Sequence, residues 1–462
     1  MTNNRTTDMT SGKPLPLILR FALPILLGNC FQLVYSMVDT LVAGHFLGEG
    51  AIAAIGATGV IFSLIMNFAW GLNSGYCIVL SRVLGSGDRE KFRHAVSFML
   101  ALNFLAASIF TLLSLLIIEP VMTALKTPAD IFSDAHLYIV IIIAGMAATI
   151  AYNMASGFMN AVGNSKIPLY FLIFSSLANV ALDIVFAVVF KAGIAGLALA
   201  TVIAQAISAA FSIAFIIKNY AELLPKKGDF FSGKGDAALG KEMISSGLSM
   251  ALMQSVVGLG TVALQRAINL LGTDYIAAHT ASRKLFDLLM VPMATLAIAN
   301  STFTSQNCGA GRFGRIRKAN CQMILLELAW SLFSVAVAFL GGRNLASWLT
   351  GSENEVIIKN AALYLRFSTL FFFPLGILFV LRYSMQTLGH KIVPVLSSGI
   401  ELALKIVFAL AVVPRMGYWG VVITEPVIWF SCAAVLTAFY LTKGNQRIQN
   451  EQKIYGGTND RT

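Results

Sequence analysis

Long apolar stretches separated by short polar segments dominate the pattern of this sequence. Each apolar stretch is about 20 residues or longer, which is the length that crosses a bilayer as an α-helix. Twelve such spans are predicted, at 16–43, 52–80, 95–118, 135–162, 168–190, 194–217, 243–270, 276–304, 319–341, 356–386, 393–413 and 418–441. The pattern therefore predicts an all-α polytopic membrane protein.

The composition supports a lipid environment. Hydrophobic residues make up 57% of the chain and charged residues only 12%, whereas about 25% of the residues of a soluble domain are charged. The formal net charge of +11 is compatible with nucleic-acid binding when taken alone. Because the basic residues lie in short loops between the spans, we interpret the charge as membrane topology. We expect the lipid bilayer, and no nucleic acid, as a partner.

The basic residues are distributed unequally between the two sides of the membrane. The termini and the loops on their side carry twenty-two lysines and arginines, and the opposite loops carry five. The positive-inside rule therefore predicts that both termini are cytoplasmic. We expect a multi-pass protein of the cell (plasma or inner) membrane. Residues 1–15 are predicted to form a retained tail, since the apolar run behind them is too long for a signal-peptide core. Residues 442–462 are predicted to form the second tail.

The chain contains two copies of one unit. LGEGAIAAIGA at 47–57 matches LGTDYIAAHTA at 271–281, and the same offset of 224 aligns GSGDREKFRHA at 85–95 with GAGRFGRIRKA at 309–319. Two further pairs follow in the same order, MNAVGNSKIP with MQTLGHKIVP and ALDIVFA with ALKIVFA. Four ordered matches predict an internal repeat.

The repeat predicts two lobes of six spans each. We expect an N-lobe at 16–217, a basic and hinge-like cytosolic linker at 218–242, and a C-lobe at 243–441. Both lobes begin on the same side of the membrane, so they are parallel repeats. Such repeats are typical of transporters that alternate access to a central cavity.

Six acidic residues fall inside the predicted spans. Charge inside a bilayer is costly, so each of them needs a partner, a proton or a wet cavity. Asp287 follows Arg283 by one helical turn and is expected to pair with it, and Glu327 lies close to the cytosolic basic loop. A structural role is expected for both. The six are Asp39, Asp183, Asp287, Glu327, Glu401 and Glu425.

Asp39 and Asp183 are predicted to lie at the same depth of the N-lobe. Asp39 follows Arg20 by 19 residues, which is roughly 28 Å of helix, and Asp183 is at a similar distance from Lys166. Asn179 precedes Asp183 by one turn and shares its face. Thr201, on a descending span, reaches about the same level.

This set of two carboxylates, an amide and a hydroxyl offers only oxygen ligands. Such ligands suit a hard cation such as Na⁺, and two close carboxylates also share a proton readily. The choice between Na⁺ and H⁺ stays open at this point. The alternative is that these groups form hydrogen bonds that only fix helix packing.

The second copy lacks this set. Ala263 takes the position of Asp39, and Glu401 and Lys405 take those of Asn179 and Asp183. Glu401 and Lys405 are one turn apart, so an internal ion pair is predicted there. Glu425 takes the position of Thr201 and, like Arg382, has no assigned role.

Pro24 lies within the first span, before Asp39. A proline removes a helix hydrogen bond and favours a kink, so this position is predicted either to be a hinge or to form a passive bend.

Several segments resemble those of one family. ALPILLGNCFQLVYSMVDTLVAGHFLG is similar to the first span of the multidrug and toxic compound extrusion (MATE) transporters, and TFTSQNCGAG, MQTLGHKIVP and GYWGVVITEPVIW resemble its second-half signatures. The resemblance covers about residues 15 to 441. It implies a twelve-helix fold of two six-helix lobes that exports amphipathic, often cationic, compounds against an inward flow of Na⁺ or H⁺.

The resemblance also implies site residues. In the branch that this chain resembles, a first-lobe cation site would consist here of Asp39, Asn179, Asp183 and Thr201. A glutamate on the seventh helix, which marks a second-lobe site in another branch, is missing from this chain. Family cavities are lined by polar and aromatic groups, which here would be Gln32, Tyr35, Asn153 and Asn160. We expect small-molecule substrates, a monomer and no cofactor besides the coupling ion.

Other function classes fit the sequence less well. A flippase for lipid-linked saccharide precursors, from the same superfamily, would need several basic residues in the first-lobe cavity, and those spans contain almost none. The chain lacks HExxH, GxSxG and Walker A motifs, so an enzyme is not expected. A pore remains an alternative that electrical recording would distinguish.

Overall fold

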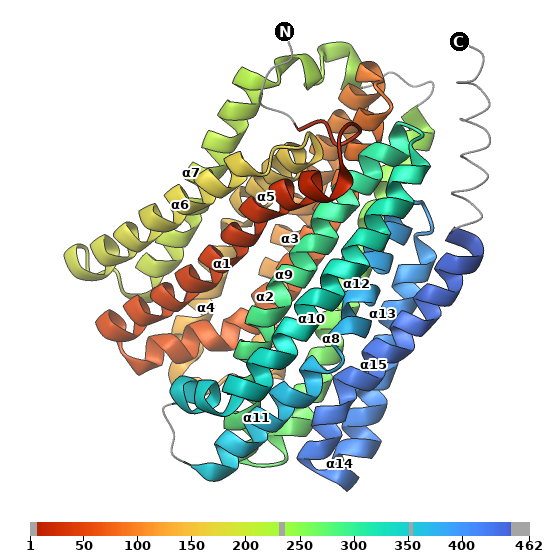
Figure 1. Ribbon diagram of the computed structural model, residues 1–462. Helices are drawn as coiled ribbons and strands as arrows, with labels where there is room; N and C mark the ends of the chain where they lie inside the picture. The colour runs from red at the N-terminus through yellow and green to blue at the C-terminus, as the bar shows by residue number, and fades with distance from the viewer. Residues whose placement is uncertain (1–6, 231–235, 351–353, 445–462) are drawn as a thin grey trace, which may run out of the picture. The chain divides into compact units, whose positions relative to one another are not determined.

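The structure is a computed structural model that describes residues 7–230, 236–350 and 354–444 (Figure 1). The predicted tails and linker therefore lie partly outside the described residues. The helices are α1 (Pro14–Leu47), α2 (Glu49–Gly85), α3 (Arg89–Ala124), α4 (Ala129–Ala144), α5 (Met146–Ala161), α6 (Lys166–Ile184), α7 (Gly193–Asn219), α8 (Asp236–Asn269), α9 (Thr273–Gly309), α10 (Phe313–Thr350), α11 (Glu355–Thr369), α12 (Phe372–Thr387), α13 (Ile392–Val407), α14 (Val413–Met416) and α15 (Tyr418–Phe439). Short π- and 3₁₀-helical turns complete the described part: η1 (Val185–Val189), η2 (Ala221–Leu223), η3 (Lys227–Phe230), η4 (Phe408–Val412) and η5 (Tyr440–Gly444).

The predicted all-α membrane fold is confirmed. Within the described residues, ten helices are long and apolar enough to cross a membrane, and two bent pairs of helices bring the number to twelve when each pair counts as one span. The bent pairs are α4 with α5 and α11 with α12. They correspond to the predicted fourth and tenth spans.

The two bends were not predicted from the sequence. The α4–α5 pair bends by 46° around Gly145, where a Cβ atom would lie 2.3 Å from the side chain of Val202. The α11–α12 pair bends by 54° just before Pro374. A proline has no N–H and clashes with the carbonyl four residues earlier, which here belongs to Leu370 in the break. The first bend thus coincides with a glycine against which Val202 packs closely, and proline geometry favours the second.

The predicted internal repeat is visible in the element bounds. Both ends of α9 lie 224 residues after the corresponding ends of α2. Both ends of α12 lie 226 residues after those of α5, so the bent span is also duplicated. A short π-helical turn follows α6 in the first copy, at Val185–Val189, and α13 in the second copy, at Phe408–Val412.

The chain divides into two compact units. The first contains Met1–Asp8 and Leu23–Ala251, and the second contains Met9–Ala22 and Leu252–Thr462. Two of the boundaries between the units fall inside helices. One lies in α1, just before Pro24, and the other lies in α8. Each of these helices is the first helix of its repeat.

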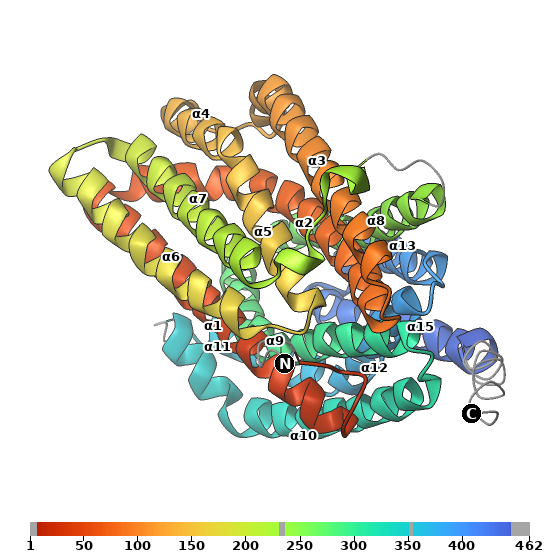
Figure 2. The same cartoon turned by 90° about the horizontal axis from the view of Figure 1, so that it is seen from above.

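The first unit is held together by contacts among its α-helices. α7 packs against α5 and α6, and α2 packs against α4 and α5, as Figure 2 shows. Aromatic rings fill the interior beside α5: Phe158 makes edge-on contacts with Phe92 and Tyr220. α7 also contacts η1, which continues α6, so the C-terminal end of α6 lies next to α7.

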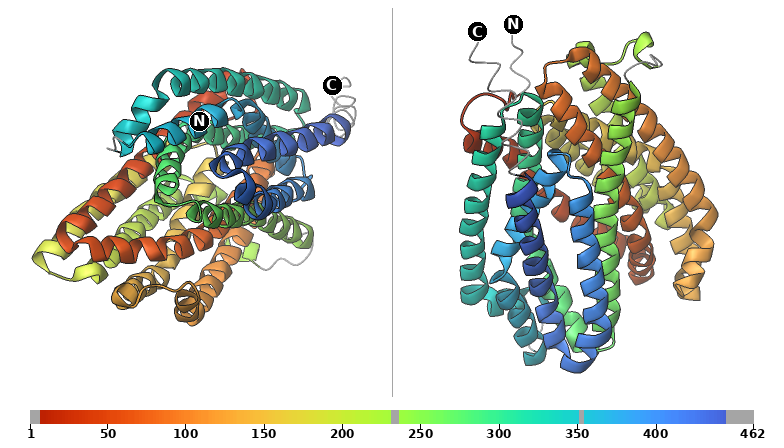
Figure 3. Two further views of the ribbon diagram at one scale, coloured as in Figure 1. Left: turned by 90° about the horizontal axis from the view of Figure 1, so that it is seen from below. Right: turned by 90° about the vertical axis from the view of Figure 1, so that its right-hand side faces the viewer.

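The second unit has the same kind of interior. α9 and α10 pack together, and α13 lies beside α15 in blue in Figure 3. Phe286 stacks on Trp429 and meets Phe372 edge-on. These rings join α9, α12 and α15, which also carry the charged side chains described below.

Two glycines allow α2 and α8 to approach closely within the first unit. A Cβ atom on Gly75 would lie 2.3 Å from the carbonyl oxygen of Ser246, and one on Gly71 would lie 2.5 Å from the Cα of Ala251. These neighbours are backbone atoms, which cannot move away by changing rotamer as a side chain can. Small residues at such positions let membrane helices pack through their backbones.

Gly75→Ala is therefore expected to destabilise the protein by about 1–3 kcal/mol, the usual cost of overpacking. Thermal unfolding of the purified protein measures this change. Gly59→Ala is the matched control, because a Cβ there meets nothing within 4 Å and alanine favours a helix. Equal melting temperatures for the two variants would contradict this packing.

The first part of the predicted linker is fixed to α3. The Asp229 carboxylate accepts the backbone N–H of Lys226 at 2.8 Å and lies 3.0 Å from Arg93 Nε. The Lys226 hydrogen bond, with help from Arg93, holds the pKa of Asp229 below its usual value. His94 Nε2 lies 3.3 Å from the same carboxylate. These contacts attach the described first part of the linker to α3, and its hinge-like role stays a prediction.

Candidate functional site

Asp39 and Asp183 face each other in the first unit. Asp39 lies on α1 and Asp183 lies at the end of α6, and their carboxyl groups are close enough for a hydrogen bond when one of them is protonated. Asp183 is completely buried, whereas Asp39 is half-buried. One oxygen of Asp183, Oδ2, has no hydrogen-bond partner among the described residues. The pair thus contains a buried carboxyl oxygen that no described residue satisfies with a hydrogen bond.

Asn179 links this pair to α1. Its Nδ2 atom donates to Asp183 Oδ1 at 3.4 Å, and its Oδ1 accepts the hydroxyl of Tyr35. The sequence predicted Tyr35 as a cavity residue, and the structure places it one turn before Asp39 and bonded to Asn179. Tyr35 therefore belongs to the same cluster as the two carboxylates.

Two further side chains complete the cluster. Thr201 on α7 interacts with the Tyr35 hydroxyl, and its own hydroxyl donates to the Leu197 carbonyl at 3.1 Å. Tyr138 on α4 lies near both Asp39 and Asp183. Sequence reasoning missed Tyr138, which is only the fourth residue of the predicted span 135–162. The helix begins earlier in the structure, at Ala129, which places Tyr138 deeper in its helix than the sequence indicated.

The residues present fit a small hard cation or a proton. Asp39 and Asp183 supply carboxylate oxygens, and Tyr35, Asn179 and Thr201 supply further oxygens nearby. No cluster of three or more His, Cys, Asp or Glu side chains suitable for a metal occurs in the described ranges. This donor set differs from the nitrogen- and sulfur-rich sites that hold zinc or copper.

The other predicted residues lie elsewhere. Gln32 is exposed on α1, and Pro24 is buried in the same helix. Asn153 and Asn160 are half-buried on α5, two turns apart on one face. Asn160 Oδ1 is buried and has no hydrogen-bond partner among the described side chains and backbone.

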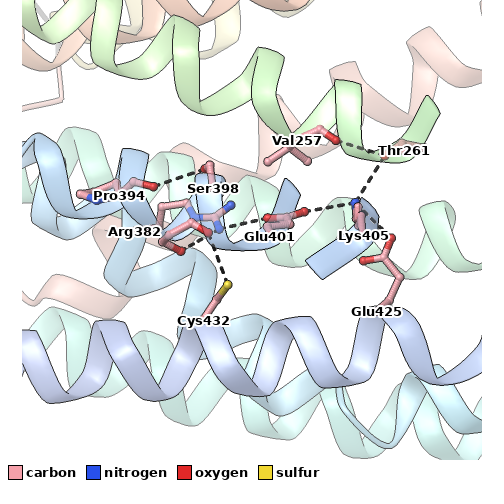
Figure 4. A network of polar contacts seen from close by, with 10 residues as sticks. Val257, Thr261, Arg382, Pro394, Ser398, Glu401, Lys405, Glu425 and Cys432 are labelled. Carbon is pink, nitrogen blue, oxygen red and sulfur yellow. Dashed lines mark hydrogen bonds and ion pairs between the residues drawn. The ribbon is translucent and has the colours of Figure 1, made fainter. Parts of the chain in front are cut away.

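The second unit has a network of ion pairs in the corresponding place (Figure 4). Lys405 Nζ lies 3.2 Å from Glu401 Oε1 and 3.3 Å from Glu425 Oε1. The predicted Glu401–Lys405 pair is thereby confirmed, and Glu425 is its third member. All three residues are almost completely buried.

Two arginines extend the network at both ends. Arg382 Nη2 lies 3.1 Å from Glu401 Oε2 and also donates to Ser397 Oγ at 3.0 Å. Arg283 Nη1 lies 3.5 Å from Glu425 Oε1, and Arg283 Nε lies 3.0 Å from Asp287 Oδ1. The predicted Arg283–Asp287 pair is confirmed. Three cations and three anions thus balance across α9, α12, α13 and α15.

Lys405 also contacts α8. Its Nζ donates to Thr261 Oγ1 at 3.4 Å, two residues before Ala263, the residue that the repeat alignment matches with Asp39. Gly260 leaves room for this lysine, because a Cβ there would lie 2.7 Å from Lys405 Cδ. The offset between the two copies is therefore not constant along the chain, and the residue that faces Lys405 follows the offset of 222.

Comparisons with known proteins agree with this architecture. The MatE family model matches residues 24–185 and 248–411. The probable multidrug resistance protein YpnP of Bacillus subtilis is 25% identical over 388 residues, which cover 83% of this chain and 84% of that protein. The probable multidrug resistance protein YoeA of the same organism is 24% identical over 430 residues, which cover 91% and 92%.

A solved structure shows the same fold. A MOP superfamily transporter from Pyrococcus furiosus has a TM-score of 0.86 at 20% identity, and the match covers 98% of this chain and 100% of that one. The family model matches both copies of the repeat and more than half of the chain, and the resemblance noted in the sequence is confirmed. This protein is therefore a membrane transporter of the MatE family.

Proposed function

We propose that this transporter is a multidrug exporter driven by an inward flow of Na⁺ or H⁺, and that Asp39 and Asp183 bind the coupling cation. One observation carries the proposal: two carboxyl groups meet in the first unit and leave a buried oxygen unpartnered, whereas Lys405 supplies the corresponding positive charge in the second unit. The names of the relatives YpnP and YoeA support drug-like substrates.

The cation and the substrate need not touch each other for coupling. A ligand shifts a conformational equilibrium when it binds one state more tightly than the other, and two such ligands then affect each other's binding. Cation binding at Asp39 and Asp183 from outside would favour release of the substrate and return to the inward-facing state. The twenty-two basic residues on the side of the termini support cytoplasmic tails and export from the cytoplasm.

Substrate binding and bending are assigned to other residues. Gln32, Asn153 and Asn160 are proposed to line the substrate cavity, and the unpartnered Asn160 Oδ1 supports this role for α5. Pro24 is proposed as a hinge of α1. The division of the chain into two compact units falls directly before it, between Ala22 and Leu23.

The coupling ion can be identified in proteoliposomes. Efflux of a cationic dye is measured once with an imposed Na⁺ gradient at fixed pH and once with an imposed pH gradient without Na⁺. A gradient of the true coupling ion accelerates efflux, and the other gradient leaves it unchanged. A rate of dye efflux that responds to neither gradient would contradict cation coupling.

Tyr35→Phe should weaken cation binding without abolishing transport. The variant removes the hydroxyl that Asn179 Oδ1 accepts, at a cost of about 1 kcal/mol for a neutral hydrogen bond, which is about a fivefold loss of affinity. The half-saturating cation concentration for dye efflux measures this loss. Tyr170→Phe is the control, because Tyr170 is exposed on α6, and equal concentrations for both variants would contradict the role of Tyr35.

A further inference from the structure

Glu327 is a buried carboxyl group outside both sites described above. It lies on α10 in the second unit, and its side chain has no exposed surface. Neither Oε1 nor Oε2 has a hydrogen-bond partner among the described residues. The sequence predicted a structural role, but a carboxylate that fixes packing is normally hydrogen-bonded or paired. The burial of this unpartnered carboxyl group therefore needs another explanation.

The neighbouring polar side chains bond to the backbone instead. Ser331 Oγ donates to the backbone carbonyl of Glu327 at 2.7 Å, and Trp330 Nε1 donates to the carbonyl of Leu289 at 2.8 Å. On the other side the carboxyl group lies over Gly376 of α12. A Cβ there would be 2.6 Å from Glu327 Cβ and 3.2 Å from Oε2, so glycine provides the space that the side chain occupies.

Among the described residues, no ion pair or hydrogen bond joins the Glu327 carboxyl group to a charged side chain of the helices that pack against α10, which are α9, α11 and α12. α9 has no Asp, Glu, Lys, Arg or His after Asp287, and Asp287 pairs with Arg283. On α12, Arg382 is held by Glu401 and Ser397, and Tyr383 interacts with Gln254. On α11, Arg366 bonds to the carbonyls of Ala338 and Phe339, eleven or more residues further along α10. The other titratable groups of α10 and α11 are Arg315, Arg317, Lys318, Cys321, Arg343, Glu355, Lys359 and Tyr364.

An ionised carboxylate in this place would be uncompensated. Burying an unpaired charge costs several kcal/mol even after the protein relaxes, and the cost is avoided when the group binds a proton. A single carboxyl group without a second oxygen ligand does not form a site for Na⁺. The surroundings of Glu327 thus favour the neutral acid in this conformation.

Two of the helices that pack against α10 have an irregularity at which their conformation could change. Gly376 lies in the second turn of α12, next to the 54° break between α11 and α12. Pro292 interrupts the hydrogen bonding of α9, the helix that accepts Trp330 at Leu289. A change of the bend at this break would move Gly376 away from Glu327 and let water reach the carboxyl group.

We propose that Glu327 is a second proton-binding site of this transporter, loaded in the present conformation and exchanging its proton with water in another state of the cycle. Release transfers the proton from a carboxyl oxygen to water, and uptake reverses this step. The inference goes beyond the proposed coupling at Asp39 and Asp183, and rests on it only in requiring a second conformational state. The proton is bound whether the first site takes Na⁺ or H⁺.

Infrared spectroscopy of the purified full-length protein tests the bound proton without transport. The wild type should show a carboxylic acid C=O band at neutral pH whose intensity falls in Glu327→Gln. Glu355→Gln is the control, since Glu355 is exposed and paired with Arg343, and it should leave the band unchanged. An unchanged band in Glu327→Gln would overturn the proposal.

The pH dependence of dye efflux tests the exchange. Glu327→Gln keeps the shape of the neutral acid but cannot release a proton, so the slope of log rate against pH should fall by about one. Glu327→Asp should restore the slope. A purely structural role predicts the opposite order, with the glutamine variant closer to the wild type, and that result would overturn the proposal. Asp39→Asn separates the two claims: normal coupling in that variant contradicts the proposed function and leaves the Glu327 result standing.

Discussion

Asp39→Asn should lower cation-driven dye efflux at least about tenfold while leaving dye binding intact. The asparagine has nearly the same shape but removes one of the two carboxylates that meet in the first unit. A cation bound between two carboxylates would keep only Asp183 as a charged ligand. A tenfold change corresponds to about 1.4 kcal/mol, which is modest for the loss of a charged partner.

The measurement is dye efflux from proteoliposomes under a fixed gradient, together with dye affinity in detergent. Asp130→Asn is the matched control, because Asp130 is exposed in the first turn of α4. It should behave as the wild type. Full cation-driven efflux in Asp39→Asn would show that the carboxyl pair serves packing only.

Lys405→Met should destabilise the protein by about 3–5 kcal/mol, the cost of removing one member of a buried ion network. Glu401 and Glu425 each lose the lysine, and each retains one arginine, at 3.1 Å and 3.5 Å respectively. The network would then have one anion too many in a buried environment. Thermal unfolding of the purified protein measures the loss.

A second substitution tests the explanation by charge balance. Adding Glu425→Gln to Lys405→Met removes the surplus anion and should recover part of the lost stability. Lys284→Met is the control for the loss of a lysine, because Lys284 is exposed on α9. A Lys405→Met variant as stable as this control would contradict the balance of three cations and three anions.

The fold was largely predictable because lipid restricts what a spanning segment can contain. Apolar length alone indicated the twelve spans, and the repeated motifs predicted bounds that recur with a fixed offset in α2 and α9. The bends at Gly145 and before Pro374 were harder to predict. Many glycines and prolines occur in straight membrane helices, and only the packing of Val202 against Gly145 distinguishes the first bend.

The candidate site was predictable to the extent that its residues are rare in spans. Asp39, Asn179 and Asp183 are polar groups at a common depth, so a simple count of residues placed them together. Tyr138 was missed because a tyrosine in a membrane helix is usually interpreted as part of an interfacial belt or the core. The assignment of the four predicted residues to cation coupling stays a prediction until transport is measured.

The second unit shows where sequence reasoning reaches its limit. The Glu401–Lys405 pair was predictable because both residues lie one turn apart on one helix. Arg382, Arg283 and Glu425 lie on three other helices, so their participation depends on how those helices pack. The isolation of Glu327 is likewise a property of the packed helices, since only the packing shows that no described cation is paired with it.

Reversed coupling tests the central claim most directly. Proteoliposomes are loaded with dye and given no ion gradient, and movement of the coupling cation is followed as the dye leaves. Linkage is reciprocal, so the outward dye gradient should drive the cation inward in the wild type and not in Asp183→Asn. Cation uptake that is equal in the two proteins, or absent from the wild type while dye still leaves, would contradict coupling through the carboxyl pair.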